Sequence, residues 1–176
     1  MSTRMDKEWN RFDTATHAVN NIDYEHHEIH AGSHFFAADY DTIANAGTID
    51  FAVTTPDTTE WAHMTFSMQG SGALSLNVYK DSDYAADGTT VTPINNNQNS
   101  SNTSGMTVQR DPTVTIAGTK IYGQYSGANR VAGIINRERE IMLEQNTRYL
   151  FRITNETAQD NVISWDADWY EHVNKS

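Results

Sequence analysis

The sequence has no cysteine, only three prolines among its 176 residues, and 12 lysines and arginines against 23 acidic residues. Without cysteine, disulfides and thiolate metal sites are excluded, and the lack of disulfide staples favours folding in a reducing cytosol. The net charge of −11 argues against binding to a nucleic-acid backbone or an anionic membrane, because both need clustered basic side chains. We therefore expect neither nucleic acid nor membrane as a partner.

Long apolar segments are also missing. No apolar run approaches the roughly 18 residues that a membrane-spanning helix needs, and Met1 to Lys7 do not form the apolar core of a signal peptide. The chain does have four Trp, eight Tyr and six Phe, which are enough large side chains for one hydrophobic core.

The first 21 residues are polar and mixed in charge, and Trp9 and Phe12 are their large aromatic side chains. Such a composition is typical of an arm that becomes ordered only against a partner. We predict an N-terminal arm over 1–21, followed by a single domain over 22–176.

The body of the chain alternates apolar and polar residues with a period of two, which indicates half-buried strands. In 61–68, Ala62, Met64, Phe66 and Met68 share one face. Short strands separated by Gly, Asn, Asp, Ser or Pro are typical of a sandwich or barrel. The sequence thus predicts an all-β domain, an antiparallel, jelly-roll-like β-sandwich. The expected strands are 22–30, 33–38, 48–54, 61–68, 73–79, 114–116, 120–125, 147–154 and 161–172.

Two segments do not fit this alternation. Residues 136–143 are consistent with either a helix or an extended edge strand. Residues 94–105 consist almost wholly of Asn, Gln, Ser and Thr, which cannot build a core and therefore predict an exposed loop. Asn and Ser bond readily to their own backbone, so local order within this loop is compatible with its composition.

Four histidines fall within nine residues: His26, His27, His30 and His34. If 22–30 is a strand, His26, Glu28 and His30 share one side, a spacing that could bind a metal as in a cupin-type metalloenzyme. The pattern lacks the glycine-led cupin motif, so an exposed polar face or a subunit contact is the favoured interpretation. We expect no metal and no cofactor.

Carboxylates occur in pairs two residues apart, and a glycosidase needs two at a defined separation. The pairs are Asp39/Asp41, Asp81/Asp83 and Asp166/Asp168. Pairs on the polar face of a strand are more often solvated or salt-bridged, and no nucleophile motif or phosphate-binding loop accompanies them. We predict no catalytic residues and a protein that is not an enzyme.

The strand tryptophans Trp61, Trp165 and Trp169 could form a sugar-binding platform. They alternate with small and polar residues, a pattern that favours burial in the core or an interface.

Several segments resemble a family of small virion proteins of tailed bacteriophages, the capsid decoration (cement) proteins and related head auxiliaries. These segments are Glu28-Ile-His-Ala-Gly32, 55–63, 95–100, 144–150 and Asp168-Trp-Tyr-Glu-His172, and the resemblance covers about 24–172. It implies a non-enzymatic protein, made in the host cytoplasm, that binds the outer head surface of the virion and stabilises adjacent major capsid subunits. It also implies a homotrimer, because decoration proteins commonly sit at local three-fold positions.

If the resemblance holds, the contacts with the capsid or with other subunits come from the arm and from the strand edge near 24–36. The expected interface residues are Trp9, Phe12, His26, His30, Phe35 and Phe36. The alternative is a carbohydrate- or receptor-binding sandwich of a fibre or tail. In that case the 94–105 loop would form the site together with Tyr79, Tyr84, Tyr122 and Tyr125.

Overall fold

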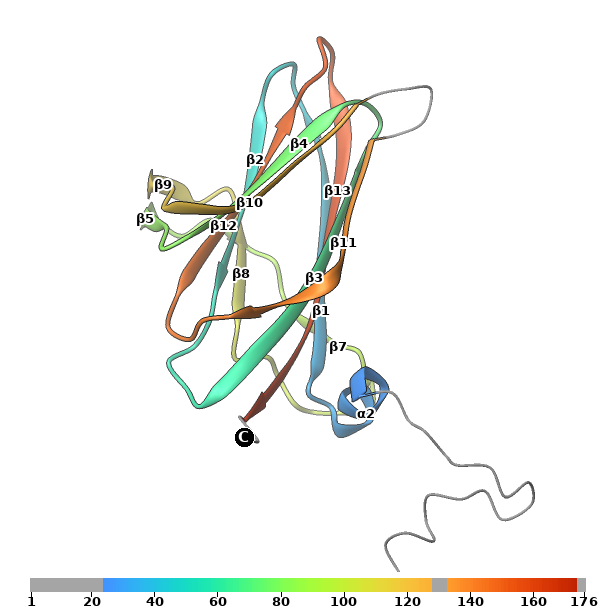
Figure 1. Ribbon diagram of the computed structural model, residues 1–176, viewed down its shortest axis with the longest axis vertical. Coiled ribbons are helices and arrows are strands. Elements are labelled where there is room, and N and C mark those ends of the chain that lie inside the picture. The colour runs from blue at the N-terminus through green and yellow to red at the C-terminus, as the bar shows by residue number, and fades with distance from the viewer. Residues whose placement is uncertain (1–23, 128–132, 174–176) are drawn as a thin grey trace, which may run out of the picture.

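The computed structural model describes residues 24–127 and 133–173, which form two antiparallel sheets packed face to face (Figure 1). The predicted antiparallel β-sandwich is confirmed. The predicted arm, with Trp9 and Phe12, lies outside the described residues, as do 22 and 23.

The first sheet has five strands in the order β11-β3-β13-β1-β7. Its centre is β13, which pairs with β3 on one side and with β1 on the other. The strands are β1 (His34–Ile43), β3 (Glu60–Gly70), β7 (Ile94–Asn95), β11 (Gly133–Leu143) and β13 (Asn161–Val173).

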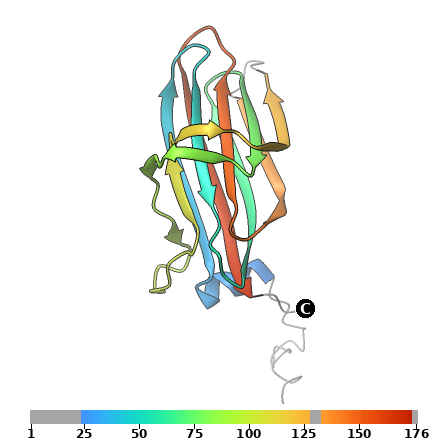
Figure 2. The same cartoon turned by 90° about the vertical axis from the view of Figure 1, so that its left-hand side faces the viewer.

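The second sheet has six strands in the order β10-β4-β12-β2-β8-β6. They are β2 (Thr48–Thr54), β4 (Leu74–Lys80), β6 (Thr89–Thr90), β8 (Thr107–Arg110), β10 (Thr119–Ser126) and β12 (Arg148–Asn155). A separate pair, β5 (Asp83–Ala86) and β9 (Thr113–Ile116), crosses in front of this sheet in Figure 2. The Tyr84 hydroxyl donates to the backbone oxygen of Tyr149 at 2.9 Å and ties the pair to the sheet.

The core forms where the alternating apolar faces of the two sheets meet, as the period-two pattern predicts. At its centre Phe51 of β2 stacks on Trp165 of β13, with ring centroids 4.4 Å apart and planes at 11°. Phe151 of β12 meets Trp165 edge-on. Trp165 and Trp169 are therefore core residues, in agreement with the favoured interpretation.

The two lateral sides of the sandwich are closed by different means. On one side Arg110 of β8 reaches Asp39 and Asp41 of β1, at 3.1 and 3.4 Å. On the other side Tyr122 of β10 packs edge-on against Phe66 and carries the Arg137 guanidinium over its ring. Polar links thus hold one side and an aromatic bridge holds the other.

The strand predicted at 22–30 is wrong, because Tyr24–Ala31 form an α-helix, α2. Apart from Tyr24, Ile29 and Ala31 its residues are polar, and these three do not fall on one strand face, so a strand here would have no continuous apolar face to bury. Gly32, at φ 73°, ends the helix. The amide of Gly32 donates to Ile29 O and that of Ser33 to Glu28 O, both at 3.0 Å, which is a Schellman cap. In the described part of the chain no helix has the length and apolar character needed to cross a membrane.

The other ambiguous segments are now resolved. Residues 136–143 belong to the edge strand β11, which has a register shift between Arg137 and Ile141, so the extended alternative is correct. The strand expected at 33–38 continues to Ile43 as β1. Most of the 94–105 loop has no regular structure, but Asn95 and Asn102 donate to the backbone oxygen of Gly32 at 2.9 and 3.1 Å. The loop is therefore ordered against the end of α2.

We predict that Phe51→Ala lowers the free energy of unfolding by about 3–5 kcal/mol, because it removes a ring stacked at the centre of the core. Urea unfolding followed by circular dichroism measures the effect. The control is Tyr40→Ala on the same sandwich, at a ring that is 71% exposed, for which a change within about 0.5 kcal/mol is expected. Equal effects of the two substitutions would contradict this description of the core.

Candidate functional site

The described histidines all lie at one end of the sandwich, the end covered by α2. This histidine pole comprises His26, His27 and His30 of α2, His34 of β1, His63 of β3 and His172 of β13. Antiparallel pairing brings the strand members together, since His34 and His63 both face Tyr170 of β13 in register. The helix α2, with which the described chain begins, and the end of β13, with which it ends, lie at this pole (Figure 1).

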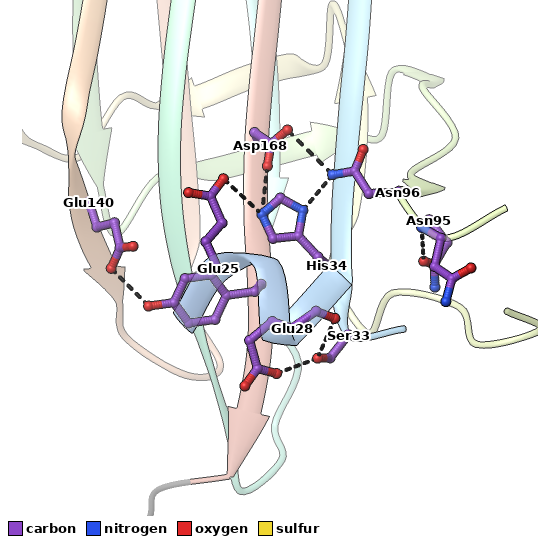
Figure 3. Close-up of polar contacts among 10 residues, drawn as sticks. Glu25, Glu28, Ser33, His34, Asn95, Asn96, Glu140 and Asp168 are labelled. Atoms are coloured by element: carbon purple, nitrogen blue, oxygen red, sulfur yellow. Dashed lines mark hydrogen bonds and ion pairs between the residues drawn. The ribbon is translucent and has the colours of Figure 1, made fainter. Parts of the chain in front are cut away.

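His34 is the centre of the pole and is only 3% exposed. Its Nε2 lies 3.1 Å from Asp168 Oδ1 on β13 and 3.5 Å from Glu25 Oε1 on α2 (Figure 3). Its Nδ1 contacts the side-chain amide of Asn96, which also reaches Asp168 Oδ2 at 3.5 Å. The Asn96 amide thus fixes Nδ1 of the His34 imidazole, and Nε2 of the same ring points between the carboxylates of Asp168 and Glu25.

Two carboxyl groups of β13, those of Asp166 and Asp168, are in an unfavourable setting for negative charge. Burial raises the pKa of the Asp168 carboxyl, and the His34 ring and the Asn96 hydrogen bond oppose this increase without cancelling it. Burial alone raises the pKa of the Asp166 carboxyl on the same strand face. The surroundings of Asp166 and Asp168 therefore favour the protonated carboxyl groups, or a positive charge next to them, over unpaired carboxylates.

A second group lies next to it on the same sheet face. His63 Nδ1 is 3.0 Å from Glu140 Oε2 of β11, and the Tyr170 hydroxyl donates to the same oxygen at 2.9 Å. His63 stacks on Tyr170, and its Nε2 is 3.1 Å from Nε2 of His172. Burial and the hydrogen bond to Glu140 raise the pKa of the Tyr170 hydroxyl. This group fixes the bulged edge strand β11 to the sheet.

An open cleft of about 360 Å³ lies between these two groups, on the outer face of the five-stranded sheet. Five carboxylates and one arginine line it, together with His34 and His63. The acidic lining residues are Glu25, Glu138, Glu140, Asp166 and Asp168, and the arginine is Arg137. The cleft is therefore negative, which favours cationic over anionic ligands.

The structure gives different results for the predicted interface residues. His26 and His30 are exposed on one side of α2, with their Nε2 atoms 3.0 Å apart. Phe36 is half-buried. Phe35 is 3% exposed and contacts the core ring of Trp169, so its prediction as a contact residue is corrected: this ring is used by the sandwich itself.

The metal ligands considered from the sequence do not gather. In a helix, residues 26 and 30 share a side, but residue 28 points elsewhere, and the Glu28 carboxylate is buried against the Ser33 hydroxyl. The group that does gather, Glu25, His34 and Asp168, comes from three separate elements. Alternation correctly placed Asp168 on the outer strand face, but it could not show that β1 is the neighbour of β13.

The residues proposed for a carbohydrate site are spread over the molecule. Tyr84 is buried at 9% exposure, and Tyr122 packs edge-on against the core residue Phe66. Tyr125 is exposed on β10, an edge strand of the six-stranded sheet, whereas the 94–105 loop lies against α2. These residues do not form one surface.

Comparisons with known proteins assign neither a family nor a function to the chain. No family model matches the chain, and no curated protein matches its sequence significantly. Among solved structures, the crystal structure of the Yersinia pseudotuberculosis-derived mitogen is similar over 80% of this chain and 89% of that chain. The sequence identity is 8% and the TM-score is 0.37. A likeness at this level carries no argument about function.

We predict that Gly32→Ala lowers the free energy of unfolding by about 1–2 kcal/mol, the cost of a left-handed backbone for a residue with a Cβ. The new methyl group would also meet the Ser100 side chain, so α2 and the 94–105 loop would separate. Urea unfolding measures the loss, and hydrogen exchange of the α2 amides locates it. Gly127→Ala is the control, because its Cβ would meet nothing closer than 3.5 Å. A loss no larger than that of the control would show that the cap does not hold the pole together.

Proposed function

We propose that this chain is a non-enzymatic structural protein of a tailed-phage virion, a capsid decoration protein that binds the outer head surface. There it would stabilise adjacent major capsid subunits. The observation that carries the proposal is the fixation of α2, which directly follows the arm, to the rigid end of the sandwich. A cement protein must transmit force from its contact segment to a body that does not deform, and a docked helix does this.

The contacts of α2 support that role. Tyr24 packs edge-on against Tyr170 with ring centroids 5.5 Å apart, and Glu25 lies beside the buried His34. At the other end of the helix the Schellman cap and the loop amides of Asn95 and Asn102 hold Gly32. The exposed His26 and His30 then face outward at the end from which the arm would reach a capsid.

The strand order supports the jelly-roll form of the proposal. The eight long strands alternate between the sheets along the chain except at β4 and β10, which are neighbours in the six-stranded sheet, so that β11-β3-β13-β1 faces β10-β4-β12-β2. The first of them pairs with the last and the second with the last but one, the nested order of two Greek keys. Jelly rolls are frequent in viral capsid proteins and lectins. The acidic net charge suits the outside of a DNA-filled shell.

We expect that deletion of residues 1–21 abolishes binding to heads that lack decoration while the sandwich stays folded. The arm would supply the aromatic anchors Trp9 and Phe12, and aromatic residues dominate interface energetics. Sedimentation with purified heads measures binding and gives the copy number per capsid subunit, and circular dichroism checks the fold. The double substitution Trp9→Ala with Phe12→Ala is the matched full-length variant. Unchanged binding of the folded, truncated chain would contradict the role of the arm.

Self-association is the second part of the proposal, and the free edge of the sandwich supports it. β10 and β11 are the terminal strands of their sheets, and they adjoin where the Ile134 amide donates to the Ser126 hydroxyl at 3.0 Å. Ile121, Tyr125 and Ile134 are 40%, 63% and 53% exposed there. A second copy could cover both the apolar side chains and the unpaired strand edge.

We predict a native mass of three 19.8 kDa chains in multi-angle light scattering. Ile121→Lys combined with Ile134→Lys should yield monomers, because charges buried at the contact would lack partners. Val162→Lys, at a side chain 48% exposed on β13, is the control and should leave the mass unchanged. A monomeric wild-type chain at tens of micromolar, or a trimer that persists in the double variant, would exclude this edge as the contact.

A further inference from the structure

Three polar side chains from three separate elements converge at the histidine pole, and their role is not explained by capsid binding. They are Glu25 on α2, His34 on β1 and Asp168 on β13, and one ligand atom from each lies within 4.8 Å of the other two. The strands hold two of these residues in the rigid sheet. The third residue, Glu25, comes from α2, the helix that is docked on this end of the sandwich.

Two of the three separations between these atoms match those of metal ligands, and the third, between the two carboxylate oxygens, is within 4.8 Å. Ligands about 2.1 Å from a divalent transition metal, at angles between octahedral and tetrahedral, lie about 3.0–3.4 Å apart. The distances from His34 Nε2 to Asp168 Oδ1 and Glu25 Oε1 are 3.1 and 3.5 Å. A cation between them would replace direct contacts with ligand bonds after small side-chain movements.

The charges of these three side chains also favour a bound cation. Several strand carboxylates of the described chain are matched by a full cation; Asp50, for example, receives two hydrogen bonds from Arg152. Among the described residues, the ion-pair partner of both Glu25 and Asp168 is the imidazole of His34, and Asn96 adds a neutral hydrogen bond to Asp168. A neutral imidazole leaves two negative charges, a protonated one leaves one, and a divalent ion leaves none.

His34 has the setting of a metal ligand. Metal-binding histidines are usually fixed through their second ring nitrogen by a hydrogen bond, and Asn96 occupies that position. When Nε2 binds a metal, Nδ1 carries the ring proton and donates it to the amide oxygen of Asn96, which requires a half-turn of the amide. The adjoining open cleft leaves room for water in the remaining coordination positions.

We propose that Glu25, His34 and Asp168 bind a divalent transition-metal ion, with Zn²⁺ the best match, and that the ion clips α2 to the sandwich. One imidazole with two carboxylates suits zinc, whereas calcium takes six to eight oxygen ligands. The ion would have a structural role, because it joins the helix to β1 and β13. This inference does not depend on the capsid role.

The test is titration of the full chain with ZnCl₂ after EDTA treatment, by isothermal calorimetry at pH 7. His26 and His30 form an exposed pair that could bind zinc on its own, so the measurement uses the double variant His26→Ala with His30→Ala. We expect one Zn²⁺ per chain, a raised melting temperature with zinc, and no competition from millimolar Mg²⁺ or Ca²⁺.

Glu25→Gln and Asp168→Asn, each in that background, should weaken binding at least tenfold and remove the thermal shift. The Glu25 side chain is 60% exposed, so Glu25→Gln keeps the fold, which circular dichroism without metal verifies. His63→Ala is the matched control at the neighbouring histidine and should leave the affinity unchanged. The proposal is overturned if the background variant binds no zinc, or if Glu25→Gln binds as tightly as the background.

Discussion

The pairing of β1 with β13 is the constraint on which the rest of the structure depends. It joins the first and the last strand over ten register pairs, from His34 opposite Tyr170 to Ile43 opposite Asn161. This contact between distant parts of the chain brings both ends of the described chain to one pole. It also places the buried imidazole of His34 next to the carboxylate of Asp168. Long-range pairing of this kind costs chain entropy before the stabilising contacts form. The stack of Phe51 on Trp165 at the centre of the core is one of the contacts that offset this cost.

Alternation predicted the core well because burial in a sandwich is a property of single strands. Met64, Phe66, Trp165 and Trp169 are all buried, as their period-two positions require. Which strands pair with one another cannot be predicted in this way, because the periodicity of a strand carries no information about its neighbours in the sheet. The sequence could therefore place Asp168 on an outer face but could not bring it to His34. Short strands such as β6, with two residues, carry too few side chains to show a pattern.

The helix at 24–31 shows the opposite failure, in which a local signal was present but misinterpreted. Gly32 followed by Ser33 is a typical helix end, and the positive φ of Gly32 confirms that role. The histidine spacing at 26–30 does not distinguish the two elements, because residues two apart share a strand face and residues four apart share a helix face. A capping signal is a constraint on the backbone itself, whereas a ligand pattern presupposes a conformation. The Gly32 signal is therefore the better guide to the conformation of 24–31.

The histidine pole combines two physical requirements that are usually separate. A docked helix needs apolar contact, and Tyr24 against Tyr170 provides some of it. It also needs its polar neighbours satisfied, yet Glu25 and Asp168 meet at a single imidazole inside an acidic cleft. The side chains of Glu25 and Asp168 are 60% and 35% exposed, so water screens part of their repulsion. The proposed zinc ion would supply the remaining counter-charge, and the affinity of the helix for the sandwich would then depend on the supply of that ion.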